Sequence, residues 1–322
     1  MHVTGHSIST KAFGELADPG LVVTCQSHQD ALRFLMSSLG QDNGVALLQG
    51  PTGSGKTTVV RELLRGMSDN TSVALVEGVH LSPRRLLTDM LSQFGFETAS
   101  RQDEQLLQMA NRFATQQTQS GKAPILIVDN ADRATASAVR LINWLAALDT
   151  KGDYLFRIVL TGQEGISALP RHNSLRSLVR RHPATYSLNP LTMQESLHYL
   201  RTRFIAAGGE DSEKVFSNEV CDRLHELSRG WPGALNERAI EVMERMTELE
   251  SARPIPRLIL TRDGATVAEY ELTKRRYVIG RTEPADIVID DGYVSKVHAM
   301  LQIYGNVVLL IDLNSTNGTT VN

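Results

Sequence analysis

The hydrophobic pattern of the chain changes its period once, near residue 250. Before that point, apolar residues recur every three or four positions in several segments, which predicts amphipathic helices, and short continuous apolar runs predict buried strands. Strands that alternate with helices are typical of an α/β fold whose parallel sheet is covered on both faces. Expected helices cover 29–39, 83–94, 103–117, 192–206, 217–228 and 232–250, and expected strands cover 45–49, 72–76, 124–129, 155–160 and 184–188.

After that point the pattern alternates with a period of two. Pro254 and Pro256 interrupt the helical pattern, and the pairs Asp263-Gly264 and Gly305-Asn306 are typical of tight turns. Six short strands around these turns predict an antiparallel β-sandwich. The strands are expected at 257–261, 266–272, 276–279, 286–289, 299–304 and 307–313. We therefore expect an α/β domain at 1–189, a helical lid at 190–250, a linker at 251–256 and an all-β domain at 257–322.

The composition restricts the class of protein. The chain has 322 residues, of which 41% are hydrophobic and 21% charged, as in ordinary globular proteins of two or three domains. Its formal net charge of −3 gives no overall attraction to nucleic acid or to an anionic membrane. The two cysteines, Cys25 and Cys221, argue against a disulfide framework, and the chain has neither a signal-peptide pattern nor an apolar run of about 20 residues. We expect a cytoplasmic protein with no membrane segment in this chain.

Residues 50–57 match the phosphate-loop pattern G-x-x-x-x-G-K-[ST] at every position. An apolar, strand-like run precedes the loop and an amphipathic helix follows it. Glycine and small residues let several backbone N–H groups approach one polyphosphate. We expect Lys56 to reach the β- and γ-phosphates and the Thr57 hydroxyl to hold Mg²⁺. The expected nucleotide-binding residues are Gly50, Pro51, Thr52, Gly53, Ser54, Gly55, Lys56, Thr57 and Thr58.

Two later strands end in polar residues. The run 124–129 is almost wholly apolar and ends in Asp129, which would lie at the carboxyl edge of the sheet, where open α/β sheets bind their ligands. A carboxylate at that edge can hold Mg²⁺ beside the phosphates. The strand at 155–160 ends in Thr161-Gly162-Gln163, so Thr161 or Gln163 could sense the γ-phosphate.

The order of these features resembles the AAA+ ATPases. Four stretches are similar to one branch of them, the ExeA/GspA-type secretion ATPases and their relatives among the transposition ATPases. They are Gly162-Gln163-Glu164, Leu178-Val179-Arg180-Arg181, Leu188-Asn189-Pro190-Leu191 and Gly230-Trp231-Pro232-Gly233-Ala234-Leu235-Asn236. The resemblance implies ATP and Mg²⁺ as ligands, with Lys56, Thr57 and Asp129 at the nucleotide and the metal and Thr161 or Gln163 as the first sensor.

The resemblance also implies an arginine finger at Arg181 that reaches the nucleotide of a neighbouring subunit. A finger supplied by another subunit requires assembly, so a homo-oligomer, as a ring or a filament, is implied. Arg176, Arg180 and Arg181 have two other interpretations: a solvated helix face, or a basic patch for the phosphate backbone of DNA. Periodicity does not separate the three.

Two positions depart from the family pattern. Asn130 stands where the family usually has the glutamate that orients the attacking water. Asparagine cannot accept a proton as a carboxylate does, so hydrolysis should be slow unless Asp132 or another acid substitutes. In the lid, Gly233 stands where an arginine is common, and only Arg238 on the same helix could replace that cation.

Three motifs in the C-terminal part resemble the FHA domain, a reader of phosphothreonine peptides. They are Gly280-Arg281, Ser295-Lys296-Val297-His298 and Asp312 to Thr319. A guanidinium, a serine hydroxyl and an Asn/Thr loop suit a dianionic phosphate on a peptide. The resemblance implies that Arg281 and Ser295 contact the phosphate, that Lys296 and Asn317 hold the peptide backbone, that Thr316 supports the pocket, and that Gly280 and His298 shape the loops. An FHA sandwich would need further strands after Asn322.

The sequence therefore predicts an AAA+ nucleotide-binding protein whose ATP-dependent assembly is coupled to a threonine-phosphorylated partner. The secretion or envelope context rests on the resemblance alone. Two alternatives stay open: a DNA-associated regulator of the transposition-ATPase kind, and a slowly hydrolysing, nucleotide-bound scaffold.

Overall fold

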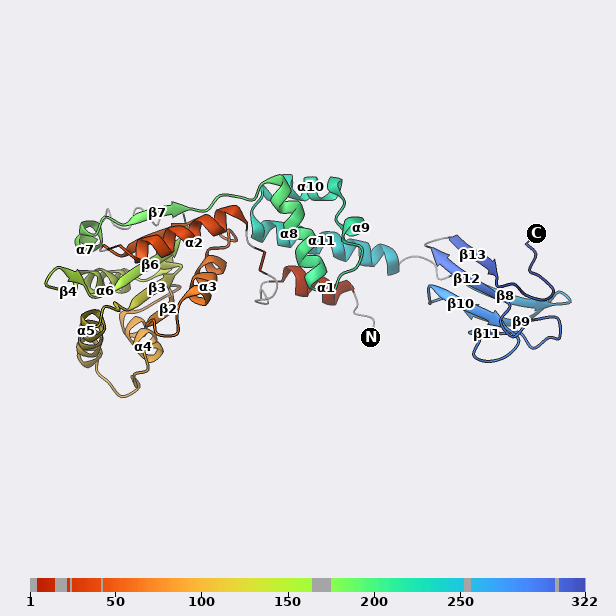
Figure 1. The fold of residues 1–322 in the computed structure, drawn as a ribbon, viewed down its shortest axis with the longest axis horizontal. Helices are drawn as coiled ribbons and strands as arrows, with labels where there is room; N and C mark the ends of the chain where they lie inside the picture. Colours follow the sequence, from red (N-terminus) through yellow and green to blue (C-terminus); the bar gives the residue numbers. More distant parts are fainter. Residues whose placement is uncertain are drawn as a thin grey trace. The chain divides into compact units, whose positions relative to one another are not determined.

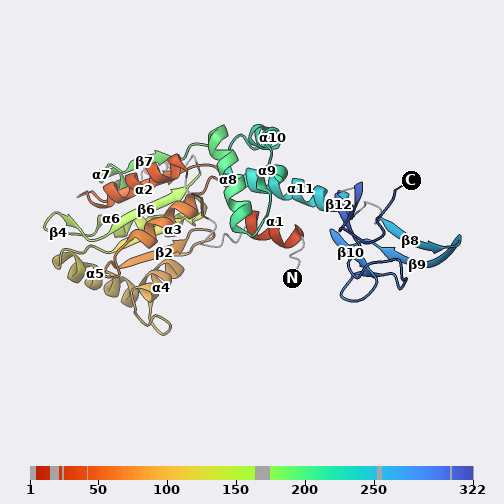
Figure 2. The same ribbon diagram turned by 45° about the vertical axis from the view of Figure 1, so that its right-hand side comes forward.

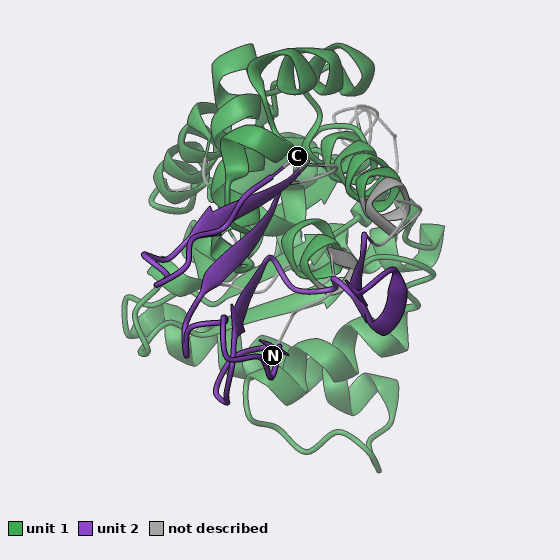
Figure 3. Ribbon diagram, turned by 90° about the vertical axis from the view of Figure 1, so that its right-hand side faces the viewer, with its two compact units in different colours: residues 1–247 green, residues 248–322 purple. Residues whose placement is uncertain are grey.

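The chain forms two compact units, residues 1–247 and 248–322 (Figure 3). The computed structural model describes residues 5–14, 22–23, 25–41, 43–163, 175–251, 256–304 and 307–321. Across these ranges, no helix has the length and apolar character that a membrane crossing requires. Part of the expected linker, Glu164, the residues 171–174 that precede the arginines at 176, 180 and 181, and the turn at 305–306 lie outside the described residues.

A five-stranded parallel sheet forms the centre of the first unit (Figure 1). The strand order is β2-β3-β6-β1-β7, so β6 separates β1 from β3. Because all strands are parallel, their carboxyl ends share one edge, and the segments that follow them meet there. The strands are β1 (Val45–Gln49), β2 (Val73–Glu77), β3 (Ile125–Asp129), β6 (Arg157–Gly162) and β7 (Ala184–Ser187).

Helices cover both faces of this sheet (Figure 1, Figure 2). Side chains of α2 and α3 pack with alternate residues of the strands on one face, and α4 to α7 pack with the remaining strand residues on the other. Alternate strand residues point to opposite faces, so a strand covered on both faces is apolar at successive positions, as β3 is up to its last residue, Asp129. The helices are α2 (Gln26–Leu39), α3 (Lys56–Gly66), α4 (Pro83–Gln93), α5 (Asp103–Gln119), α6 (Ala136–Ala147) and α7 (Arg176–Arg180).

The lid consists of α8 (Met193–Ala206), α9 (Ser212–Val215), α10 (Asn218–Ser228) and α11 (Pro232–Ser251), whose last residues belong to the second unit. Thr192 and Glu195 form a capping box at the start of α8: Glu195 N donates to Thr192 Oγ1 at 3.2 Å and Thr192 N donates to Glu195 Oε2 at 2.8 Å. Helix α1 (Gly5–Phe13) completes the core of the lid, where Phe13 meets Phe216 edge to face at 5.6 Å.

Several elements of the first unit were not expected from the sequence. They include helices α1, α6, α7 and α9 and the short hairpin of β4 (Asp149–Thr150) and β5 (Asp153–Tyr154). Most of the residues in α6 are apolar or small, so its sequence has little of the polar face that marks an amphipathic helix.

The second unit is built from β-strands. Strands β8 (Arg257–Arg262) and β9 (Ala265–Glu271) form one antiparallel pair, and a four-stranded sheet has the order β11-β10-β12-β13. One expectation was wrong: β10 and β11 pair in parallel, so the β-structure is not wholly antiparallel. Leu272, Tyr277, Ile287 and Leu301 form a small core. The four-stranded sheet contains β10 (Arg276–Gly280), β11 (Ile287–Val288), β12 (Ala299–Tyr304) and β13 (Val307–Asp312).

Candidate functional site

The loop between β1 and α3 forms a backbone cradle at the carboxyl edge of the sheet. Gly53 and Gly55 have positive φ angles of 77° and 94°, in the left-handed region that favours glycine. A Cβ built on Gly50 would lie 2.7 Å from Ser54 Oγ, so that position also requires glycine. Helix α3 begins at Lys56, and its N-cap residue, Gly55, makes no side-chain bond to the N–H groups of the first turn, which includes Thr58. These N–H groups, at the positive end of the helix dipole, suit an anionic group such as a polyphosphate.

Lys56 is buried inside this cradle. Its ammonium donates to the carbonyl oxygens of Gly50 at 2.8 Å and Pro51 at 2.9 Å, and its exposed fraction is 7%. Burial lowers the pKa of Lys56, whereas the charges of Asp129 and Asp132 act in the opposite direction. A phosphate anion next to the ammonium would offset the cost of burying its charge.

Asp129 links three elements at the mouth of the loop. Thr57 Oγ1 of α3 donates to Asp129 Oδ2 at 2.6 Å, and the hydroxyl of Thr161 at the end of β6 donates to Asp129 Oδ1. The carboxylate and Thr161 are buried, with exposed fractions of 3% and 0%. A hydroxyl and a carboxylate held beside a phosphate cradle are ligands that suit Mg²⁺, so the predicted pair Thr57 and Asp129 fits this ion.

The two candidate first sensors occupy different environments. Thr161 binds Asp129 and also accepts a hydrogen bond from the backbone N of Asn130 at 3.1 Å, so it fixes the carboxylate. Gln163 is exposed, and its Nε2 lies 3.4 Å from Oγ1 of Thr52 in the phosphate loop. The geometry therefore favours Gln163 over Thr161 for contact with the loop's ligand.

Asn130 is the first residue after β3. Its backbone adopts the left-handed conformation, with a φ angle of 54°. Asparagine tolerates this conformation better than most residues. Its Nδ2 donates to Oε1 of Glu77, at the end of β2, at 3.2 Å. Sequence reasoning missed Glu77, although β2 ends in a carboxylate just as β3 does.

The lid touches the phosphate loop through two glycines. Gly233 N donates to the carbonyl of Gly53 at 2.8 Å, and a Cβ on Gly233 would lie 2.7 Å from Gly53 Cα. A side chain at Gly233 would therefore collide with the loop, which explains glycine at this position. Arg238 pairs with Glu241 on its own helix at 2.9 Å.

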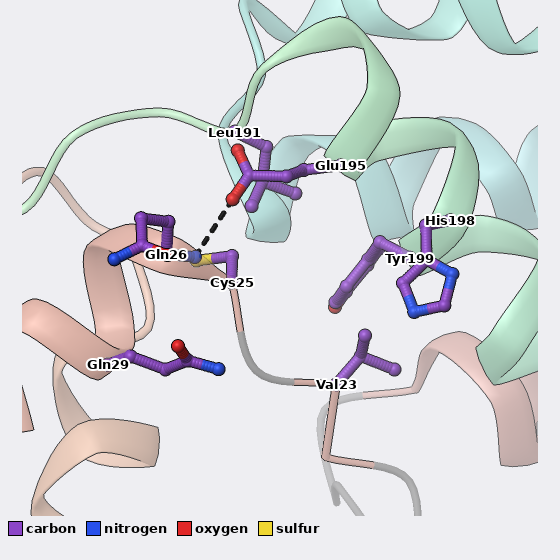
Figure 4. A pocket seen from close by; sticks show the side chains of 8 residues that line it. All are labelled: Val23, Cys25, Gln26, Gln29, Leu191, Glu195, His198 and Tyr199. Carbon is purple, nitrogen blue, oxygen red and sulfur yellow. Dashed lines mark hydrogen bonds between the residues drawn. The ribbon is translucent and has the colours of Figure 1, made fainter.

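The segment before the first strand also reaches the loop. His28 Nε2 lies 2.9 Å from the carbonyl oxygen of Ser54, and burial lowers the pKa of this imidazole. Nothing in the sequence pattern singled out His28. The same end of α2 forms one wall of a cavity of about 120 Å³ whose other wall is α8 (Figure 4). Gln26 N donates to Glu195 Oε1 across it at 2.8 Å, and the lining residues are Val23, Cys25, Gln26, Gln29, Leu191, Glu195, His198 and Tyr199.

The expectation that Arg181 is an arginine finger was wrong. Its exposed fraction is 1%, and its guanidinium lies 4.2 Å from the ring centroid of Tyr154. It donates to three backbone carbonyls of its own chain, those of Asn43 at 2.6 Å, Phe156 at 2.8 Å and Ala146 at 3.4 Å. Burial lowers the pKa of Arg181 to about 10. Arg181 therefore joins the end of α7 to α6 and to the residues that precede β1 and β6, whereas Arg176 and Arg180 are exposed.

Replacing Arg181 with alanine should reduce the free energy of unfolding by about 3 kcal/mol, because three backbone carbonyls, two of them in buried hydrogen bonds, would lose their donor. Urea denaturation followed by circular dichroism measures this change. The matched control is Arg180→Ala, on the same short helix, which should change stability by less than about 0.5 kcal/mol. Equal stability of the two variants would contradict the structural role of Arg181.

Three loops of the second unit bring the predicted phosphate-binding residues together. Arg281 N donates to the carbonyl of Ser295 at 3.0 Å, and the Ser295 hydroxyl accepts from Thr316 N at 3.0 Å. Asn317 Nδ2 donates to the carbonyl of Tyr293 at 2.7 Å. Lys296 is exposed at the same loop. The predicted residues therefore lie on neighbouring loops, although they are separated along the sequence.

Glycine and hydrogen bonds hold these loops in place. A Cβ on Gly280 would lie 2.1 Å from the carbonyl oxygen of Lys296, so the loops can approach only if this residue is glycine. His298 Nδ1 accepts from Ser295 N at 3.0 Å. Asp312 accepts from the hydroxyls of Ser315 at 2.6 Å and Thr319 at 2.7 Å, and these bonds hold the pKa of its carboxyl below the usual value.

Two protein-family models match the chain. A family model described as an AAA domain matches residues 39–169, and one described as an FHA domain matches residues 277–322. The chain combines an AAA domain with an FHA domain. The fold class is confirmed: a parallel sheet with helices is followed by a β-sandwich of the FHA kind.

Curated relatives match each part separately. General secretion pathway protein A of Aeromonas hydrophila is 29% identical over 237 residues, which are 73% of this chain and 43% of that protein. The FHA domain-containing protein FhaA of Mycobacterium tuberculosis is 43% identical over 60 residues, which are 19% of this chain and 11% of that protein. The chain thus spans less than half the length of these relatives.

Solved structures support the fold of the AAA part. Cdc6p of Pyrobaculum aerophilum has a TM-score of 0.55 at 14% identity, covering 75% of this chain and 66% of that chain. ORC2 of Aeropyrum pernix in its ADP form has a TM-score of 0.53 at 14% identity, covering 76% of this chain and 75% of that chain. At such low identity the likeness concerns the fold alone.

Proposed function

We propose that the AAA domain binds ATP with Mg²⁺ and hydrolyses it. The observation that carries this proposal is the buried Asp129 carboxylate, which accepts hydrogen bonds from Thr57 and Thr161 at the mouth of the glycine cradle. When bound, Mg²⁺ would supply positive charge that stabilises the negative charge developing on the phosphates. In this proposal Thr57 and Asp129 hold the ion, Lys56 contacts the phosphates, and the backbone N–H groups of residues 50–58 surround them.

The cavity between α2 and α8 is the part of the site that we assign to the nucleotide base. It lies where α2 begins, and His28 of the same helix contacts the phosphate loop. Its wall combines apolar side chains such as Val23 and Leu191 with amide groups such as Gln29, a mixture that suits a purine. At about 120 Å³ the cavity is smaller than most ligand pockets.

For the FHA domain we propose recognition of phosphothreonine peptides. The support is the meeting of Arg281, Ser295 and Thr316 on adjoining loops. A guanidinium forms two charge-assisted hydrogen bonds to one phosphate, and a hydroxyl adds a third donor. Lys296 and Asn317 would bind the peptide backbone on either side.

The two activities are joined in one proposed role: nucleotide-dependent self-assembly that is coupled to a threonine-phosphorylated protein. In this proposal residues 1–189 form the nucleotide-binding domain, residues 190–250 form its helical lid and residues 257–322 form the peptide-binding domain. The similarity to general secretion pathway protein A supports a role in a secretion system. The free, buried thiols of Cys25 and Cys221 are compatible with a reducing cytoplasm.

Sedimentation velocity tests the assembly directly. The wild type with Mg²⁺ and a slowly hydrolysed ATP analogue should sediment as an oligomer, and the same protein without nucleotide should sediment as a smaller species. Lys56→Ala should stay small in both conditions, because it lacks the cation that contacts the phosphates. A nucleotide-bound wild type that remains monomeric would contradict the proposal.

A further inference from the structure

A second carboxylate lies at the same edge of the sheet as Asp129. Glu77 is the last residue of β2, and its Cα is in register with that of Asp129 on the adjacent strand β3. Its side chain is exposed, whereas Asp129 is buried. Of the two carboxylates, only Glu77 is therefore open to a water molecule.

Asn130 fixes the position of this carboxylate. Oε1 of Glu77 accepts from Asn130 Nδ2 at 3.2 Å and from Val79 N at 3.2 Å. Among the described residues, none bonds to Oε2, so this oxygen can accept a proton from water. Asn130 and Glu77 together place an amide and a carboxylate where the family usually has a single glutamate.

The backbone around the pair is held tightly. Gly78 N donates to the carbonyl of Asp129 at 2.7 Å, and a Cβ on Gly78 would lie 2.3 Å from the carbonyl oxygen of Asn130. The ends of β2 and β3 can approach this closely only because residue 78 is glycine. The distance between Glu77 and Asn130 is thus set by the sheet rather than by a flexible loop.

We propose that Glu77 is the general base of ATP hydrolysis and that Asn130 is its positioning residue; this inference rests on the ATPase function proposed above. The oxygen of a water molecule forms a bond to the γ-phosphorus, and the bond from that phosphorus to the β–γ bridging oxygen breaks. The bridging oxygen keeps the electron pair and leaves as part of ADP. The water proton passes to Glu77 Oε2 and then to solvent, so the products are ADP and inorganic phosphate.

Asp132 is the competing carboxylate. It lies on the short 3-10 helix Ala131–Arg133 directly after Asn130, it is exposed, and its charge acts on Lys56. The amide of Asn130 nevertheless bonds to Glu77. If Glu77 is the base, only its substitution should slow hydrolysis. If Asp132 is the base, only the substitution of Asp132 should do so.

The test compares Glu77→Gln with Asp132→Asn in the full-length protein. Glu77→Gln should lower single-turnover hydrolysis about 100-fold, the usual contribution of a general base, and Asp132→Asn should stay within about threefold of wild type. Affinity for ATP·Mg²⁺ should be unchanged in both variants. After incubation and filtration, nucleotide retained by Glu77→Gln should be ATP, and nucleotide retained by the wild type should be ADP.

A swapped variant adds an internal check. The double substitution Glu77→Asn with Asn130→Glu should restore hydrolysis to within about tenfold of wild type, since the carboxylate and amide exchange places. The inference is overturned if Glu77→Gln turns over as fast as wild type, if Asp132→Asn loses more activity, or if a wild type that binds ATP hydrolyses it no faster than Lys56→Ala. Failure of the wild type to bind ATP would instead overturn the proposed function itself.

Discussion

Replacing Arg281 with alanine is expected to weaken binding of a phosphothreonine peptide about 1000-fold, because a guanidinium makes two charge-assisted hydrogen bonds worth about 4 kcal/mol together. Ser295 and Thr316 would keep their mutual hydrogen bond, since Arg281 meets Ser295 through its backbone N. The loops should therefore keep their shape while the phosphate loses its strongest donor. Fluorescence anisotropy with a labelled phosphothreonine peptide measures the change.

The matched control is Arg276→Ala. Arg276 is exposed at the opposite end of β10, so its removal changes the charge of the domain equally without touching the loops. We expect its peptide affinity to stay within about threefold of wild type. The unphosphorylated peptide should bind neither the wild type nor Arg276→Ala. Equal losses in the two variants, or equal binding of the two peptides, would show that Arg281 does not recognise the phosphate.

The parts of the site that depend on local sequence were predictable. The phosphate loop is one continuous segment whose glycines are required by the loop's own backbone angles, at Gly53 and Gly55. The strand that ends in Asp129 is equally local, since an unbroken apolar run identifies it. Gly280-Arg281 and the Ser295 loop are also continuous segments that can be recognised in the sequence. Only the resemblance to the FHA domain indicated that these loops lie next to each other.

The roles of Arg181, Glu77 and Gly233 depend on contacts that are distant in sequence. Arg181 and Arg180 are neighbours in a basic segment, yet one is buried against three carbonyls and the other is exposed. Gly233 is glycine because Gly53 lies against it. Sequence periodicity contains no information on such pairs, so it could not show that Arg181 is buried.

Two features of the fold were missed because the sequence pattern that would predict them is weak. Helix α6 was missed because it has little polar face. The parallel pairing of β10 with β11 was missed because the alternating pattern of a strand is the same in parallel and antiparallel sheets, and β11 pairs through only two residues.

Replacing Lys56 with alanine is expected to reduce affinity for ATP·Mg²⁺ about 1000-fold, because truncating one partner of a buried charge pair costs about 4 kcal/mol. The fold should tolerate the change. Lys56 bonds only to the carbonyls of Gly50 and Pro51 among the described residues, and both belong to its own loop. Thr57 and Asp129 would remain in contact, so any loss reflects the missing ammonium.

Isothermal titration calorimetry of ATP into the wild type and into Lys56→Ala, each with and without Mg²⁺, tests the central claim. The account predicts binding near one nucleotide per chain in the wild type, tighter with Mg²⁺, and almost no heat in Lys56→Ala. Absence of binding to the wild type, or equal affinity in the two proteins, would contradict it.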